Sequence, residues 1–133
     1  MDLDIYLKKI KFEEKTGLSK EDIIDIEREI GFVYPIEYKE MLMKFNGGYG
    51  SIGGYYIDFW EIDDILVYYD ENEDIKDLII FASDGCGVAF AFKKKNQSIC
   101  SIPMDSLKKA YSREISANYV EFLQKMYDGK LKY

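Results

Sequence analysis

Apolar residues in the first third of the chain recur at the spacing of amphipathic helices. Three groups fall at intervals of three or four residues, so each group would form one stripe along a helix. The groups are Leu3, Tyr6, Leu7 and Ile10; Ile23, Ile26 and Ile30; and Tyr38, Met41, Leu42 and Phe45. The pattern predicts three consecutive helices, each burying one face.

Polar and turn-forming residues mark where these helices begin and end. Gly17 is a plausible end for the first helix. Ser19 is followed three residues later by Asp22, a capping-box pattern that predicts the start of the second helix, and Gly31 supplies the left-handed residue that ends it. Pro35 suits the first turn of the third helix, where its missing N–H costs nothing. Residues 46–48 (NGG) then close that helix.

The period changes after Gly54. Aromatic and β-branched residues predict strands, and the polar stretches between them predict turns. The predicted strands are residues 55–60, 77–82, 88–92 and 99–103, with a short helical turn over 61–66 and hairpin turns over 83–87 and 93–98. A last apolar stripe predicts a C-terminal helix that ends near Gly129; it comprises Ile115, Tyr119, Phe122, Leu123 and Met126.

Helices, then a meander of strands, then a helix indicate an α+β fold. We expect the N-terminal helices and the C-terminal helix to pack on a largely antiparallel, meander-like twisted β-sheet. The chain has 133 residues and neither a long linker nor an internal repeat, so we expect one domain over residues 1–133.

The segment FNGGYGSIGGYYIDFW contains glycines 48, 50 and 53 at the G-x-G-x-x-G spacing of nucleotide-binding loops. In a dinucleotide-binding fold these glycines follow a strand and open a helix, so that the pyrophosphate meets the helix N-terminus. Here they follow a predicted helix and lead into a predicted strand. A joint between structural elements is therefore a better interpretation than a phosphate-binding loop.

The formal net charge of −7 is concentrated in one segment. Residues 61–77 (EIDDILVYYDENEDIKD) contain eight acids and one base, Lys76. The whole chain has 25 acids and 18 bases, so the other residues carry 17 of each. Direct nucleic-acid binding needs a basic footprint, and this segment is the reverse. It would suit a basic protein partner, or it could be a solvated loop that only aids solubility.

Candidate catalytic and metal-binding groups are scarce. The chain has no histidine, which removes the commonest general base and metal ligand. Cys86 lies between two glycines beside Asp84, whose charge would oppose a thiolate. The adjacent acids of the acidic segment lack the spacing of an EF-hand loop. We therefore expect neither an enzyme nor a cofactor or metal site.

The sequence also bears on location. It has no run of 18 apolar residues, and its N-terminus, MDLDIYLKKIKFEE, lacks the apolar core of a secretory signal. Two cysteines are too few for a disulfide framework. We expect a cytoplasmic protein with both cysteines as thiols.

An ordered set of residues resembles the signature of the SUKH superfamily, the Smi/Knr-like family of cell-wall-assembly regulators and immunity proteins. The likeness spans about residues 19–127. It rests on Glu27, Ile30-Gly31, Pro35, Tyr38, Leu42, Asn46-Gly47-Gly48, Tyr56-Ile57-Asp58-Phe59-Trp60, Phe81-Ala82-Ser83-Asp84-Gly85 and Phe122-Leu123, with Cys86-Gly87 as a local departure.

The resemblance implies an α+β fold and a non-catalytic, protein-binding role. Bacterial relatives resemble immunity proteins that neutralise a cognate toxin, often a nuclease; fungal relatives regulate cell-wall assembly. We expect an immunity protein, with a regulatory or scaffold protein as the alternative and a small-ligand protein using the glycine segment as a third class. The candidate partner-binding residues are Trp60, Asp63, Asp64, Tyr68, Tyr69, Asp70, Glu71, Glu73 and Asp74.

Overall fold

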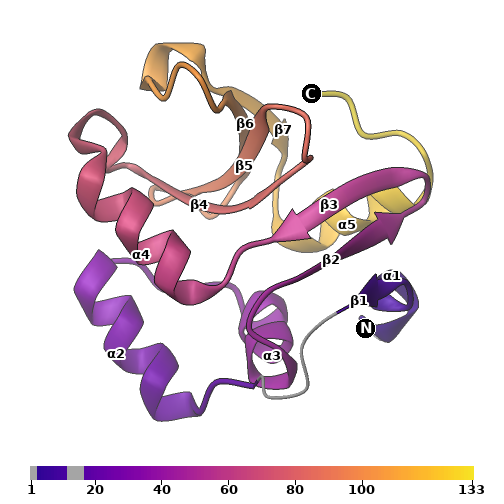
Figure 1. Cartoon of the computed structure of the whole chain (residues 1–133), viewed down its shortest axis with the longest axis horizontal. Coiled ribbons are helices and arrows are strands. Elements are labelled where there is room, and N and C mark those ends of the chain that lie inside the picture. The colour runs from indigo at the N-terminus through magenta and orange to yellow at the C-terminus, as the bar shows by residue number, and fades with distance from the viewer. Residues whose placement is uncertain (1–2, 12–16) are drawn as a thin grey trace.

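The computed structural model describes residues 3–11 and 17–133. Within these residues, seven strands form one antiparallel sheet in the order of the chain, a continuous meander (Figure 1). The strands are β1 (Ile10–Lys11), β2 (Gly48–Ile52), β3 (Tyr55–Phe59), β4 (Leu78–Ser83), β5 (Val88–Lys93), β6 (Ile99–Pro103) and β7 (Arg113–Ser116). The architecture is α+β with helices packed on an antiparallel sheet, as the pattern predicted.

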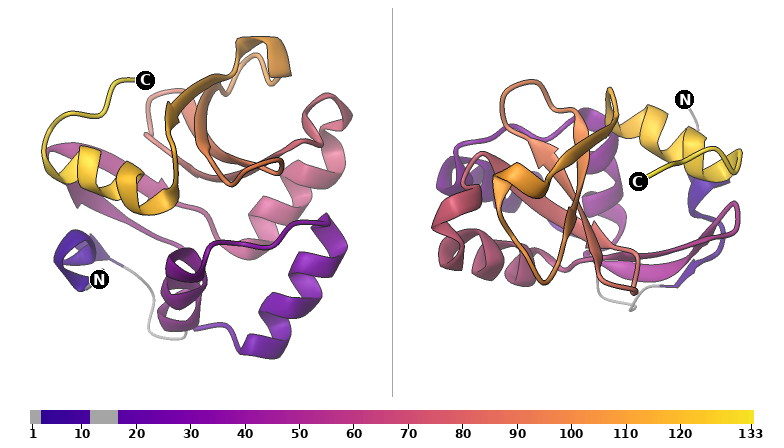
Figure 2. Two further views of the ribbon diagram at one scale, coloured as in Figure 1. Left: turned by 180° about the vertical axis from the view of Figure 1, so that it is seen from behind. Right: turned by 90° about the horizontal axis from the view of Figure 1, so that it is seen from above.

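The helices lie mainly along one face and one flank of this sheet. They are α1 (Asp4–Leu7), α2 (Lys20–Ile30), α3 (Ile36–Lys44), α4 (Ile62–Glu71) and α5 (Tyr119–Tyr127), with single 3₁₀ turns η1 (Glu73–Ile75) and η2 (Lys109–Tyr111). Figure 2 shows α5 lying along the β2–β3 ribbon, while α2 and α4 lie side by side at the opposite end. No helix of the described ranges is long and apolar enough to cross a lipid bilayer.

Two apolar clusters cover the two faces of the sheet. The larger cluster joins the buried sides of α1, α2, α3 and α5 to side chains such as Ile57, Phe59 and Phe92. The smaller cluster lies on the other face and includes Ile80, Cys100 and Ile102. Adjacent residues of a strand point to opposite faces, so this double burial explains why β4, β5 and β6 are apolar almost throughout.

The predicted helix ends are confirmed for α2. The Ser19 hydroxyl accepts a hydrogen bond from the Asp22 amide at 3.1 Å, and the Asp22 carboxylate accepts one from the Ser19 amide. Gly31 has φ +65° and ends the helix in the left-handed conformation. Pro35 stands one position earlier than the first turn that we expected: it precedes α3, and its carbonyl accepts a hydrogen bond from the Lys39 amide at 3.0 Å.

Two of the predicted helices are shorter than their apolar stripes indicated. The first helix ends at Leu7, and Ile10 lies in β1, where it pairs with Gly50 of β2. Gly17 lies outside this helix, at a position where a side chain would collide with the carbonyl group of Met43. Ile115 belongs to β7 rather than to the last helix, which begins after Asn118. Ile10 and Ile115 were both correctly predicted to be buried. Their backbone is extended because β1 pairs with β2 and β7 pairs with β6.

The glycine segment contains a strand that the sequence reasoning missed. Residues 48–52 form β2, and Gly53 and Gly54 make the turn into β3. A side chain at Gly50 would collide with the carbonyl of Lys9, and one at Gly53 would collide with the end of α5. These glycines therefore allow close approach of neighbouring backbones, which supports the interpretation as a structural joint.

The acidic segment also differs from expectation. Its predicted short turn over 61–66 is a ten-residue helix, α4, followed by η1. Ile62 and Ile65 of α4 and Ile75 of η1 are buried, which anchors the segment at both ends. Six of the eight acids of residues 61–77 therefore lie on α4 or on η1 rather than in an open loop.

Candidate functional site

Strand β3 and helix α4 bring two carboxylates and two aromatic rings together. Ile57 and Phe59 of β3 are buried in the large cluster, so Asp58 and the following residue, Trp60, share the opposite face. The ring centroids of Trp60 and Tyr68 lie 4.7 Å apart. Asp64 precedes Tyr68 by one helical turn. We call Asp58, Trp60, Asp64 and Tyr68 the acidic–aromatic surface.

This surface has a firm backbone. The Trp60 amide donates to the Phe81 carbonyl at 2.9 Å, which extends the β3–β4 pairing by one residue. Helix α4 begins directly afterwards, and the Asn46 side chain accepts a hydrogen bond from the Ile62 amide at 2.8 Å. The indole of Trp60 packs against both apolar clusters, so only part of it is exposed.

Most of the carboxylates around α4 make no ion pair within the part of the chain that the structure describes. The predicted partner-binding acids make one ion pair within residues 3–11 and 17–133. It joins Glu73 to Lys76 at 3.7 Å on an exposed turn. Partial burial and the nearby charge of Asp64 raise the pKa of Asp58 above its usual range. The charged form of Asp58 is therefore disfavoured here, and an added cation would relieve that cost.

The distribution of charge along α4 is unfavourable at its C-terminal end. Asp63 and Asp64 lie in the first turn, where negative charge is stabilised by the helix dipole. Asp70 and Glu71 lie in the last turn, which contains no basic residue and where the same dipole opposes them. We call Asp70, Glu71, Glu73 and Asp74 the α4-end cluster; Glu73 and Asp74 belong to η1.

Tyr69 is separated from the other predicted residues by its structural contacts. Its hydroxyl donates to the Ile30 carbonyl at 3.3 Å and accepts from the Lys94 ammonium at 2.7 Å. The Lys76 ammonium lies 4.2 Å from the centre of the Tyr69 ring and donates to the Tyr69 carbonyl. Tyr69 thus ties α4 to α2 and to the β5–β6 hairpin, whereas Asp63 and the α4-end cluster face solvent.

Three residues of this region were not predicted as site residues: Asp58, which belongs to the acidic–aromatic surface, and its neighbours Tyr49 and Tyr56. Tyr49 pairs with Asp58 across the β2–β3 ribbon, and the tyrosine rings are about half exposed, at 51% and 48%. The pKa of Tyr56 is raised by desolvation and then by the charge of Asp58. The alternation over residues 56–60, with Ile57 and Phe59 between polar or aromatic neighbours, could have revealed this face from the sequence.

The two cysteines and the possible metal ligands have no surroundings that would support catalysis or metal binding in the described residues. Cys86 is exposed in the β4–β5 turn, and its amide donates to the Asp84 carboxylate at 2.8 Å. Cys100 is buried, which raises the pKa of its thiol to about 11. In the described parts of the chain, no three Cys, Asp or Glu side chains gather as a metal site would require.

Comparison with known proteins identifies the family of this chain. No curated protein sequence matches the chain. A sequence model of the SMI1/KNR4 family (SUKH-1) matches residues 17–131, which include the glycine segment, the acidic–aromatic surface and α5. Because this match extends over far more than half of the sequence, the chain belongs to the SMI1/KNR4 family (SUKH-1).

Proposed function

We propose that this protein is a non-catalytic immunity protein that binds and neutralises a cognate toxin domain in the cytoplasm. Family membership supports a protein-binding module. The observation that carries the proposal is the acidic–aromatic surface, where two neighbouring carboxylates flank a pair of aromatic rings. In this proposal the whole chain, residues 1–133, acts as one SUKH-like domain.

The chemistry of this surface suits a basic partner. Aromatic faces attract guanidinium and ammonium groups, and the carboxylates of Asp58 and Asp64 add charge-assisted hydrogen bonds. A toxin with nuclease activity must bind phosphates, so its active site presents such cations. An acidic face on a rigid strand and helix could occupy that site in place of the nucleic acid.

Co-expression tests this function directly. The C-terminal domain encoded by the neighbouring gene is expressed in cells with and without this protein, and growth and co-purification are measured. Rescue of growth together with a stable complex is the expected result. Killing without rescue would exclude the immunity role. A neighbour that is not a toxin, with an endogenous partner recovered instead, would favour the regulatory role of the family.

Matched variants test the site. Asp58→Asn combined with Asp64→Asn removes two charges from the acidic–aromatic surface, and we expect binding to weaken by roughly tenfold or more. Glu29→Gln combined with Glu40→Gln removes the same charge from exposed positions of α2 and α3 and should leave affinity unchanged. Equal losses for both pairs would show that net charge alone governs binding.

The α4-end cluster has a separate role in this proposal. Its acids lie beside the surface and would attract a basic partner before contact, which affects association rather than dissociation. Replacing Asp70, Glu71, Glu73 and Asp74 together by Ser should slow association at low salt by roughly tenfold. An unchanged association rate would place the partner on another face.

A further inference from the structure

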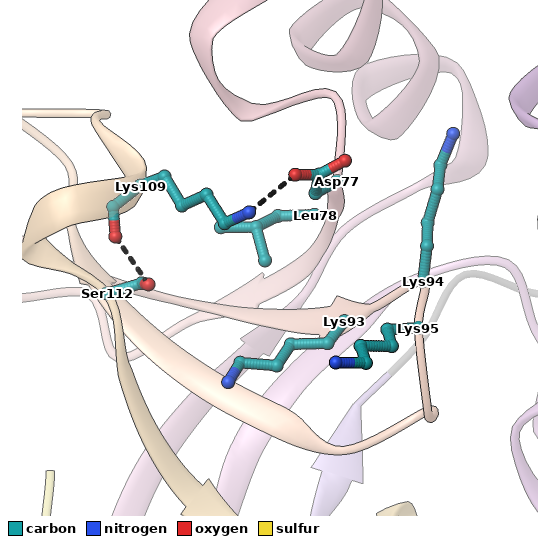
Figure 3. A pocket seen from close by; sticks show the side chains of 7 residues that line it. All are labelled: Asp77, Leu78, Lys93, Lys94, Lys95, Lys109 and Ser112. Atoms are coloured by element: carbon teal, nitrogen blue, oxygen red, sulfur yellow. Dashed lines mark hydrogen bonds and ion pairs between the residues drawn. The ribbon is translucent and has the colours of Figure 1, made fainter.

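A cavity lined by lysines lies at the end of the acidic segment of residues 61–77, and Asp77 forms part of its wall. It has a volume of about 600 Å³ and is lined by Asp77, Leu78, Lys93, Lys94, Lys95, Lys109 and Ser112 (Figure 3). Residues 93–113 contain six bases and one acid, so they carry five positive charges in a chain whose net charge is −7. The even balance outside residues 61–77 therefore conceals a local excess of cations.

The strands explain why the lysines converge. Lys93 ends β5 and pairs with Leu78 of β4, and the Lys94 amide donates to the Asp77 carbonyl at 2.9 Å. Lys94 and Lys95 follow directly in the turn that leads to β6. In Figure 3 the side chains of Lys93 and Lys95 point in the same direction, while Lys94 points away from them, and its ammonium donates to the Tyr69 hydroxyl of α4 at 2.7 Å.

The third cation comes from the opposite wall. Lys109, in η2, donates to the Asp77 carboxylate at 2.7 Å, and this contact lowers the pKa of Asp77. Lys93 makes only a 3.4 Å contact with Glu114. Within the described residues, the Lys95 ammonium has no hydrogen-bond or ion-pair partner. Three ammonium groups therefore border the cavity with one aspartate among them, and their mutual repulsion favours a bound anion.

We propose that this cavity binds a small ligand that carries two or more linked phosphate groups. Lysine ammonium groups bind phosphate as point charges, and several amines spread around a cavity of this size match clustered rather than single negative charges. Ser112, whose hydroxyl already donates to the Lys109 carbonyl at 2.7 Å, lines the same wall. The site uses none of the residues of the acidic–aromatic surface, so the two sites can be tested with separate variants.

Calorimetric titration of the full chain tests this site with tripolyphosphate, ADP, adenosine and tri-glutamate. We expect tripolyphosphate and ADP to bind, whereas adenosine and tri-glutamate should not. Tighter binding of ADP would identify a nucleotide as the source of the phosphates, and equal binding would identify the phosphate groups alone. Failure of both phosphates to bind at millimolar concentration, or equal binding of tri-glutamate, would overturn the proposal.

Three variants separate the site from nonspecific charge. Lys95→Gln and Lys109→Gln should each weaken tripolyphosphate binding by about tenfold, as expected for loss of a charge-assisted hydrogen bond. Asp77→Asn removes the one acid that lines the cavity among the described residues and should tighten binding severalfold, a gain that partial unfolding cannot produce. Lys130→Gln is the matched control, because Lys130 is exposed in the segment after α5 and does not line the cavity. It should leave tripolyphosphate binding unchanged. Equal weakening by Lys130→Gln, or weaker binding by Asp77→Asn, would contradict the assignment.

Discussion

The side chain of Asn46 caps the helix that begins sixteen residues later, because its Oδ1 atom accepts a hydrogen bond from the Ile62 amide at 2.8 Å. Helix α4 needs this contact, since the residue at its own N-cap position, Glu61, makes no side-chain cap. Gly47 makes the approach possible: it has φ +85°, and a side chain there would meet Glu61 and the Phe59 carbonyl. The NGG sequence thus positions the acidic helix rather than simply ending α3.

We predict that Asn46→Ala lowers the free energy of unfolding by about 1 kcal/mol, the usual cost of losing a capping side chain. Urea denaturation measures this change. Asn46→Asp is the control, because aspartate caps a helix about as well as asparagine and should retain most of the stability. If Asn46→Asp were as destabilising as Asn46→Ala, the contact with Ile62 would not be the source of the effect.

A contact between residues so far apart, such as this cap, could not be predicted from the sequence, whereas local features could. Contacts within a few residues were recognisable, such as the capping box at Ser19 and the left-handed Gly31, because their geometry depends on local residues only. The apolar strands β4, β5 and β6 were recognised to within about one residue. The α+β class, helices α2 and α3 and the strands β4, β5 and β6 therefore followed from local patterns.

The missed elements depend on partners that are distant in sequence. Strand β2 is rich in glycine and has low intrinsic strand propensity, and its pairing with β1 on one side and β3 on the other holds it extended. Strand β7 is likewise defined by its pairing with β6. In the candidate site, Asp58 gained its significance only when β3 placed it near Asp64, a proximity that the segment-by-segment charge count did not show.

Asp58 gives a prediction that distinguishes a binding residue from a stabilising one. Its pKa is raised in the folded protein, so the stability that its protonated form contributes is present at low pH and is lost as the pH rises through that pKa. At neutral pH, Asp58→Asn should therefore leave the urea midpoint unchanged or raise it. Below the ordinary Asp pKa of 3.8, variant and parent should differ least.

Burial is the larger cause of the raised pKa of Asp58, and Asp64→Asn tests the second cause, the nearby negative charge. Removing the Asp64 charge should lower the pKa of Asp58, which NMR titration of the side-chain carboxyl can follow. Glu29→Gln, on α2, should leave the pKa of Asp58 unchanged. For the preceding prediction, a lower urea midpoint of Asp58→Asn than of the parent protein at neutral pH would show that the Asp58 carboxylate stabilises the fold.

Two core tyrosines offer a test of buried polar groups. Tyr34 and Tyr38 are almost fully buried, at 1% and 0% exposure, and neither hydroxyl has a hydrogen-bond partner among the described residues. Burial raises the pKa of Tyr38 well above its ordinary value. An unpaired buried hydroxyl is costly, so Tyr38→Phe should raise the free energy of unfolding by about 1 kcal/mol.

Tyr119→Phe is the matched comparison for this prediction. The Tyr119 hydroxyl is also buried but donates to the Met41 sulfur at 3.2 Å, so its removal should bring no such gain. Urea denaturation of both variants compares them. A lower stability of Tyr38→Phe would show that its hydroxyl is hydrogen-bonded in the native protein.

The carboxylate of Asp84 connects the β4–β5 turn to Tyr133. This carboxylate accepts from the Cys86 amide at 2.8 Å, from the Val88 amide at 3.0 Å and from the Tyr133 hydroxyl at 3.0 Å. Since Asp84 is buried and charge-assisted hydrogen bonds are strong, Asp84→Ala should cost about 2–3 kcal/mol of stability. Cys86→Ser, at the exposed tip of the same turn, should change stability little.

The tyrosine titration reports the same contact independently of stability. Desolvation, together with the hydrogen bond to Asp84, raises the pKa of Tyr133 to about 12. Asp84→Asn should lower this pKa, because the neutral amide no longer opposes the phenolate, and the change can be followed by ultraviolet absorbance or by NMR. If the pKa of Tyr133 were unchanged in Asp84→Asn while the fold remained intact, the C-terminal residue would not be held by Asp84 in solution.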